Sequence, residues 1–277
     1  MVRAGSFRPS VSEVSFGEVK DARETIGKYE LAFSDGRILS LDGKIDRLDD
    51  AELDGEKIAI VFDYKRRDRT FNWSKLYYGL DMQLPIYMLA VRNASRGQRT
   101  EDRGQRTEDR GQKTEDALCS ILDAQVAGAF YMPVEVTPTG ATLDELSEKT
   151  EGFDYKAKGI FNGEFSRELD KAALKDSKFY NFYVTKDGEP YGSYGNRGVL
   201  KPADFEKVLK FTERKIVRLA EEILSGRIEV KPYRLSGKSP CSYCKYKPLC
   251  RFDWQINDYN PLESLGKIRV LEEMGGG

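Results

Sequence analysis

Apolar and polar residues alternate along residues 28–65, and the turn dipeptides Asp35-Gly36 and Asp54-Gly55 interrupt the alternation. Alternation is typical of β-strands with one covered face, and Asp-Gly is a favoured hairpin turn. The pattern therefore predicts three consecutive strands joined as a β-meander. The last strand, residues 57–62, is apolar on both faces, which indicates a position in the middle of a covered sheet.

The apolar spacing changes to a helical period from Trp73 to about Asn93. Asn72 or Ser74 can cap the start of this predicted helix, and Pro85 inside it predicts a kink or a break. A second amphipathic helix is predicted at about 204–224, with an apolar face that runs from Phe205 to Ile223 and a closing Gly226.

The region between the two helices gives a weaker pattern. Residues 124–136 are rich in β-favouring side chains and predict a return strand with its core at 127–131. Residues 137–200 predict loops and short helices, with one short strand at 179–184. Residues 96–116 are a strict seven-residue repeat without an apolar residue, which predicts a solvated, flexible insertion and not a coiled coil.

The amino-acid composition limits the classes of protein to which the chain can belong. The 277 residues are 39% apolar and 11% aromatic, enough for a sizeable core in one large or two small domains. The 45 Lys and Arg nearly balance the 46 Asp and Glu, so attraction to nucleic acid must come from local patches. Neither a membrane span nor a secretory signal is visible in the sequence. We therefore expect a cytoplasmic protein with no membrane partner.

The cysteines and the absence of histidine restrict the chemistry. Three of the four cysteines, Cys241, Cys244 and Cys250, lie within ten residues, which favours metal or cluster ligation over a disulfide framework. Histidine is absent, which excludes Ser-His-Asp and Cys-His catalysis and histidine-ligated zinc. Carboxylates, lysine or cysteine must therefore carry any chemistry.

Two carboxylates and a lysine are expected at neighbouring strand ends. Alternation places Asp46 on the face of its strand opposite Ile45, and Asp63 and Lys65 project to one side of the next strand. Carboxylates hold a hard divalent ion that polarises a phosphate, and an ammonium steadies the negative charge. The alternative is a solvated strand with surface ion pairs, which contribute little.

The residues around these positions resemble the sequence motifs of a known family. Gly43-Lys44-Ile45-Asp46-Arg47, Asp63-Tyr64-Lys65 and the pair Gln83 and Tyr87 resemble, in order, the GxxDR, DYK and QxxxY motifs of RecB-type nucleases of the PD-(D/E)xK superfamily. Residues 77–84 and the stretch from Gly226 to CSYCKYKPLC are similar to the carboxy-terminal nuclease domains of the AddB/RexB chains of AddAB/RexAB helicase-nucleases.

The resemblance implies a role for each matched position. Asp46, Asp63 and the carbonyl of Tyr64 would hold Mg²⁺, and Lys65 would be the catalytic lysine. Gln83 and Tyr87 would contact the DNA backbone or brace the site, although a helical Gln and Tyr at that spacing are otherwise ordinary surface and core residues.

The cysteine spacing C-x2-C-x5-C resembles three ligands of the family's four-iron four-sulfur (4Fe-4S) cluster, and zinc is the alternative. The family's fourth cysteine precedes the nuclease motifs, where this sequence has none, and Cys119 is the only spare. A histidine from an upstream helix is also missing. We therefore expect a shortened chain, with Glu13 or Glu18 as a candidate replacement beside the metal.

The fold expected from the resemblance is an α/β, restriction-endonuclease-like core, a mixed sheet flanked by helices, with a C-terminal helix and cysteine cluster. The expected divisions are a nuclease core with the catalytic motifs (1–95), the repeat insertion (96–116), the remainder of the nuclease domain (117–235) and the cysteine-rich segment with the tail (236–277).

The implied function is a metal-dependent DNA exonuclease domain that works with an AddA/RexA-like helicase-nuclease partner and processes double-strand breaks for recombination repair. Two alternatives remain. One is a stand-alone RecB-like exonuclease of the CRISPR-associated type. The other is a catalytically degenerate domain that only binds DNA or supports a complex.

Overall fold

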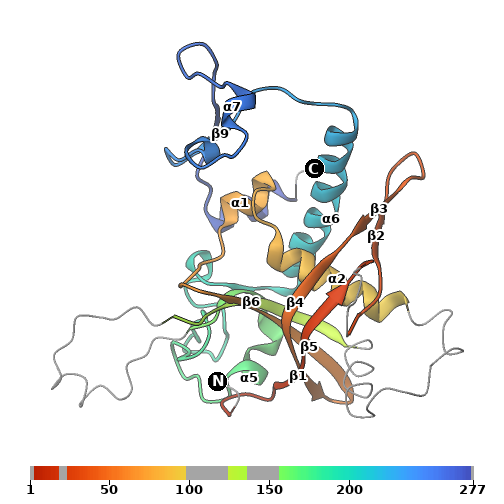
Figure 1. The fold of residues 1–277 in the computed structure, drawn as a ribbon. Coiled ribbons are helices and arrows are strands. Elements are labelled where there is room, and N and C mark those ends of the chain that lie inside the picture. Colours follow the sequence, from red (N-terminus) through yellow and green to blue (C-terminus); the bar gives the residue numbers. More distant parts are fainter. Residues whose placement is uncertain (1–2, 19–23, 98–123, 136–155, 276–277) are drawn as a thin grey trace, which may run out of the picture.

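A six-stranded mixed sheet lies at the centre of the fold (Figure 1). The computed structural model describes residues 3–18, 24–97, 124–135 and 156–275. The strands are, in spatial order, β1 (Arg8–Phe16), β4 (Gly43–Leu53), β5 (Glu56–Lys65), β6 (Gln125–Pro133), β7 (Lys158–Asn162) and β8 (Val199–Leu200). β5 and β6 pair in parallel, as do β7 and β8, and the other neighbours are antiparallel. The predicted mixed sheet is confirmed.

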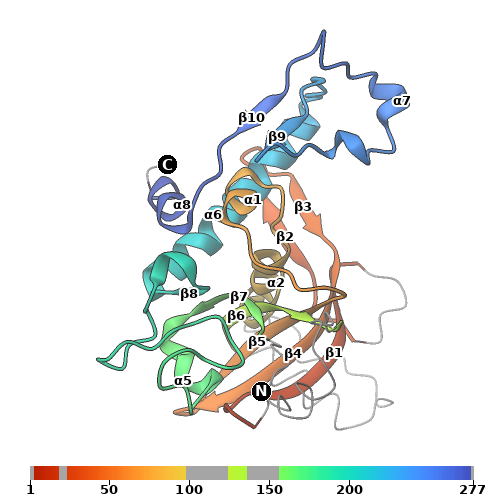
Figure 2. The same cartoon turned by 90° about the vertical axis from the view of Figure 1, so that its left-hand side faces the viewer.

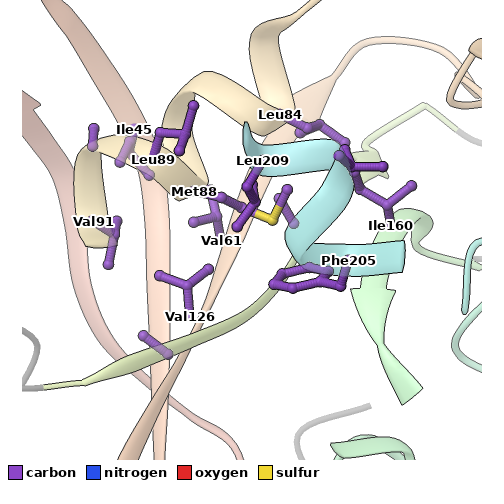
Figure 3. Close-up of a cluster of buried hydrophobic side chains, with 14 of the residues drawn as sticks. Ile45, Val61, Leu84, Met88, Leu89, Val91, Val126, Ile160, Phe205 and Leu209 are labelled. Atoms are coloured by element: carbon purple, nitrogen blue, oxygen red, sulfur yellow. The ribbon is translucent and has the colours of Figure 1, made fainter. Parts of the chain in front are cut away.

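Two helices cover one face of the sheet. These are α2 (Gln83–Gly97) and α6 (Pro202–Leu224), and Figure 3 shows their side chains, among them Met88, Phe205 and Leu209, packed around Val61 and Val126 of the strands. We call this the α2 face. The opposite face carries an aromatic cluster that includes Phe62, Phe130 and Phe161, and it is covered by chain from the η1 turn (Gly163–Phe165), α5 (Ser166–Leu169) and the loop that follows.

The predicted three-strand meander is four strands in the structure. β2 (Tyr29–Ala32) and β3 (Ile38–Leu41) form a separate hairpin, and β4 begins only at Gly43. The chain changes partners at Asp42, whose Oδ1 accepts the N–H of Glu18 at 2.8 Å, while Gly43 pairs with Phe16 of β1. The predicted turn at 54–55 is confirmed, with both residues at positive φ between paired strands.

The helix predicted at 73–93 is broken, but not by Pro85. α1 (Trp73–Tyr78) begins at the predicted cap Asn72 and ends at Gly79, which adopts φ 76°. α2 then begins at Gln83, so Pro85 lies in its first turn, where a missing N–H costs no helical hydrogen bond. The break therefore positions the start of α2 beside the strand ends.

The two other predicted strands and the second predicted helix have different outcomes. The return strand is confirmed as β6, with a buried core at 127–131. The strand predicted at 179–184 is wrong, since these residues make only isolated bridges, and β7 was missed. Helix α6 is confirmed, but Ile223 is exposed because the helix extends beyond the sheet (Figure 2).

After α6 the chain forms a small two-stranded unit and then packs back against the core. β9 (Tyr233–Leu235) and β10 (Asn260–Leu262) pair in parallel and bracket the η3 turn (Pro240–Ser242) and α7 (Lys247–Cys250). α8 (Lys267–Glu273) then packs near α1, and Ser74 Oγ exchanges hydrogen bonds with the backbone of Leu265. Within the described ranges, no helix is long and apolar enough to cross a membrane. Beyond Arg96 and Gly97 at the end of α2, the repeat lies outside the described residues.

Candidate active site

The ends of β4 and β5 bring the two predicted carboxylates together. The last register pair between these strands is Arg47 with Phe62. Beyond it, the N–H of Tyr64 donates to Oδ2 of Asp46 at 2.7 Å, so a side chain takes the place of the next ladder bond. The charge of Asp46 is close enough to raise the pKa of Asp63. Asp46 and Asp63 thus lie near each other at the neighbouring ends of β4 and β5.

Asp63 is the most buried member of the site, with 2% of its surface exposed. Its Oδ2 lies 2.5 Å from Lys65 Nζ, an ion pair without the alignment of a hydrogen bond, and its Oδ1 accepts from Gln83 Nε2 at 2.7 Å. Burial raises the pKa of Asp63, Lys65 lowers it, and Asp46 raises it again, with a net increase. The folded chain thus holds a carboxylate that binds a proton more readily than a free one.

Gln83 and Tyr87 brace this carboxylate from α2. They stand one helical turn apart, and Gln83 Nε2 also contacts the Tyr87 hydroxyl at 2.9 Å. Burial raises the pKa of the Tyr87 hydroxyl; the hydrogen bond from Gln83 lowers it, and the charges of Asp63 and Asp46 raise it. A hydroxyl that stays protonated can donate a hydrogen bond towards the site.

A second layer of contacts was not predicted from the sequence. Arg69 pairs with Asp81, and its guanidinium lies 4.6 Å from the ring centroid of the buried Tyr131. Lys65 Nζ lies 5.5 Å from the same ring, so two cations share one aromatic neighbour beside Asp63. The basic run from Lys65 to Arg69 was the available signal, but only the strand pairing shows which of its members reaches the site.

Arg47 holds the other side of the site. It forms a two-point ion pair with the buried Asp49, stacks 4.5 Å from the centroid of Phe62 and donates to the Tyr64 hydroxyl at 2.9 Å. Since the N–H of Tyr64 holds Asp46, these contacts fix both ends of Tyr64. The arginine of the GxxDR pattern therefore acts on the site through Tyr64.

The donor atoms suit a hard divalent ion. Two carboxylates meet, and Asp63 Oδ2 is a buried oxygen that accepts no hydrogen bond. Across the part of the chain that the structure describes, no third acid or cysteine joins them in a metal-holding group. The candidate replacements Glu13 and Glu18 form ion pairs with Lys44 and Lys28 instead. Asp46, Asp63 and the Tyr64 carbonyl remain the candidate ligands.

The three cysteines of the C-x2-C-x5-C segment line the same cavity, but their thiols do not surround a common point. Cys241, Cys244 and Cys250 line one cavity of about 270 Å³ together with aromatic side chains, Trp254 among them. Among the residues with described positions, these thiols do not converge into a metal-holding group. Cys119, the candidate fourth ligand, lies outside the described residues.

The comparisons agree with this geometry. The family pattern of the PD-(D/E)XK nuclease superfamily matches residues 2–251, and the chain belongs to this superfamily. Curated relatives are named as the B chain of an ATP-dependent helicase/deoxyribonuclease. The chain is 31% identical to the one from Natranaerobius thermophilus, over 97% of this chain and 21% of the relative. It is 30% identical to the one from Caldanaerobacter subterraneus subsp. tengcongensis, over 95% and 21%. The chain thus spans about a fifth of the length of these relatives.

Removing the amide of Gln83 should weaken the orientation of Asp63 but leave both carboxylates in place. In Gln83→Leu, Asp63 Oδ1 loses its hydrogen bond, and we expect about a 10- to 150-fold fall in the rate of DNA cleavage, because one hydrogen bond to a charged group contributes about 1.5–3 kcal/mol. Tyr87→Phe should have a smaller effect. Steady-state cleavage rates with a labelled oligonucleotide measure both variants. A larger loss of rate in Tyr87→Phe than in Gln83→Leu would contradict the prediction that Gln83 matters more.

Proposed function

We propose that this chain is a magnesium-dependent DNA nuclease domain whose site comprises Asp46, Asp63 and Lys65. The observation that carries the proposal is the buried carboxylate of Asp63, which is held at once by Lys65 and Gln83 and faces the charge of Asp46. A structural ion pair on a surface would not need a second carboxylate beside it. Membership of a nuclease superfamily supports the same conclusion.

The chain's own residues divide the work of phosphodiester hydrolysis. Asp46 and Asp63, with the Tyr64 carbonyl, would hold Mg²⁺, which supplies Lewis-acid stabilisation of the charge on the phosphate. Lys65 offers N–H donors to the attacking water or to a phosphate oxygen as negative charge grows there. Gln83 keeps Asp63 oriented, and Tyr87 can donate a hydrogen bond to the DNA backbone.

The names of the relatives suggest the setting in which this domain works. We propose that it is the nuclease part of a helicase-nuclease, that a chain of the AddA/RexA kind is its partner, and that it processes broken DNA for recombination repair. A stand-alone exonuclease is the alternative. Co-purification with a helicase chain from the same organism separates them, because a stand-alone enzyme would be recovered without one.

Removal of the metal tests the proposal directly. We expect cleavage of single-stranded DNA to stop in a chelator and to return when Mg²⁺ is restored, while Ca²⁺ restores binding more than cleavage. Calorimetric titration with Mn²⁺ should show a binding step that is absent in Asp46→Asn. Undiminished cleavage in the chelator would refute the metal-dependent mechanism, and a chain that binds DNA but never cleaves it would favour the degenerate alternative.

We also propose that Cys241, Cys244 and Cys250 ligate a 4Fe-4S cluster, with zinc as the alternative. Their thiols line one cavity, which supports this proposal. Protein purified without oxygen should show a broad visible absorption that is lost on oxidation if the metal is iron-sulfur. Cys244→Ser should abolish the band, whereas bound zinc without a band would select the alternative.

A further inference from the structure

A second cavity lies on the α2 face, beside the candidate active site and apart from its carboxylates. It has a volume of about 200 Å³ and is lined by Phe71, Trp73, Lys158, Asn181, Arg197 and Lys267, among others. We call it the β7 pocket, after the strand that begins at Lys158. It contains the cationic side chains of Lys158 and Arg197, the buried amine of Lys267, whose pKa burial lowers to about 7, two aromatic rings and the side-chain amides of Asn181 and Asn196. This combination fits neither a purely apolar ligand nor a metal ion.

Strand register places this pocket next to the site. Asp63 of β5 pairs with Tyr131 of β6, and Tyr131 pairs with Lys158 of β7. Paired residues project to the same side of a sheet, so Asp63 and Lys158 share the α2 face two strands apart, roughly 10 Å at the usual inter-strand spacing. A DNA strand cut at Asp63 would reach the pocket with a nucleotide close to the scissile bond.

Lys158 and Arg197 of the pocket are held in place but keep unused donors. Lys158 Nζ pairs with Asp68, and Arg197 contacts Asp176 at 3.1 Å and Asn181 at 3.0 Å, in both cases through Nη1. An arginine has five N–H donors in a rigid fork and a lysine has three, so these contacts leave donors for a phosphate. Each cation is therefore oriented in advance, which lowers the entropic cost of binding.

Lys267 holds the loop that forms one side of the pocket. Lys267 is 1% exposed, and its Nζ donates to the carbonyls of Tyr194 at 2.9 Å, Arg197 at 3.1 Å and Val199. The loop that carries Arg197 is thus tied to α8. Phe71 and Trp73, which also line the pocket, form an edge-to-face pair with ring centroids 5.1 Å apart, and Lys267 Nζ lies 5.7 Å from the centroid of the Trp73 ring. Half-buried rings beside a cationic wall are the elements of a site for single-stranded nucleic acid.

We infer that the β7 pocket binds one nucleotide of single-stranded DNA, with the phosphate on Lys158 and Arg197 and the base against Trp73. This inference rests on the proposed function and adds to it a subsite that neither the family motifs nor the predicted catalytic residues include. The volume of about 200 Å³ is below the roughly 300–1,000 Å³ usual for sites that take drug-sized molecules, which agrees with a site for one nucleotide and not for several.

The phosphate contacts are tested by the salt dependence of binding. We expect Lys158→Gln and Arg197→Gln each to weaken the binding of a fluorescent single-stranded oligonucleotide in chelator. Each change should also reduce the slope of log affinity against log salt by about 0.7, the value for one lost phosphate contact with a single strand. Lys156→Gln is the matched control, because Lys156 pairs with the same Asp176 as Arg197 but does not line the pocket. Unchanged slopes in both pocket variants, or an equal change in the control, would overturn the inference.

The base contact is tested on the unaltered protein. A single abasic position is moved along the oligonucleotide, and we expect one position near the cleaved bond where affinity falls between about 5- and 150-fold, the range for one lost stacking contact. Trp73→Leu should remove this position dependence. A flat profile in the unaltered protein would exclude base binding in the pocket.

The two proposals fail in different ways. Unaltered protein that binds and cleaves DNA, with pocket variants that behave like it, would leave the nuclease in place and remove only the subsite. Unaltered protein that neither binds nor cleaves DNA would refute the proposed function, and the subsite with it. Thermal melting of each variant confirms that the folded protein is being compared.

Discussion

Asp63→Asn should reduce magnesium-dependent DNA cleavage by about 1,000-fold or more. The substitution keeps the size of the side chain and an oxygen for Gln83, but it removes the charge that would hold the metal beside Asp46. A metal ion stabilises the charged transition state by several kcal/mol, and each 1.36 kcal/mol is a factor of ten in rate. Single-turnover cleavage at saturating Mg²⁺ measures the loss.

A thermal shift separates lost chemistry from lost folding. Mg²⁺ should raise the melting temperature of the unaltered protein, because a ligand that binds only the folded state stabilises it, and it should not raise that of Asp63→Asn. Asp50→Asn is a suitable control, since Asp50 lies on β4 away from the site and pairs in register with Arg8 and Ala59. Full cleavage by Asp63→Asn would remove Asp63 from the site altogether.

Much of this site could be predicted because its signals are local. Asp63 and Lys65 are two residues apart on a strand whose apolar run identifies it as central, so their common direction follows from strand geometry. Gln83 and Tyr87 stand one turn apart for an equally local reason. The resemblance to a nuclease family then assigned roles to positions that pattern alone had left as ordinary residues.

Strict alternation along β4 does not explain how Asp46 comes to lie near Asp63. Ile45 and Leu48, three residues apart, both pack into the core on the α2 face, so β4 does not alternate strictly at this point. On the paired strand, Glu13 adopts φ 59°, a conformation that non-glycine residues rarely take. This irregularity involves two strands at once, and no pattern within one strand could reveal it.

Features that depend on distant segments were missed altogether. The β7 pocket combines the 70–73 segment, the start of β7, the 181–198 loops and the start of α8, which only the folded chain brings together. Strand β7 itself begins beside a long stretch without clear periodicity, and a strand of five residues is too short to identify alone. Local patterns thus located the candidate catalytic groups, whereas the surface proposed to guide DNA to them depends on tertiary packing.

Lys65→Met should reduce cleavage by about 100- to 1,000-fold, the usual effect of losing one donor to a developing negative charge. The change has a second consequence, because Lys65 lowers the pKa of Asp63 while burial raises it. Asp63 must be deprotonated to hold a cation, and its pKa already lies above the ordinary 3.8, so activity is lost as pH falls through that raised value. Without Lys65 the acid limb of the rate profile should move to higher pH.

This shift distinguishes two roles for the lysine. If Lys65 acted only on the phosphate, Lys65→Met would lower the rate equally at every pH, and metal affinity would be unchanged. If it also keeps Asp63 ionised, Mn²⁺ affinity should fall at the acid end of the range and recover as pH rises, while the rate stays low throughout. Arg66→Gln is the control, because Arg66 is a neighbouring exposed cation that pairs with Glu135 and not with Asp63. We expect the second outcome, because burial and Asp46 raise the pKa of Asp63 and Lys65 opposes them more strongly than Arg69, the other cation that lowers it.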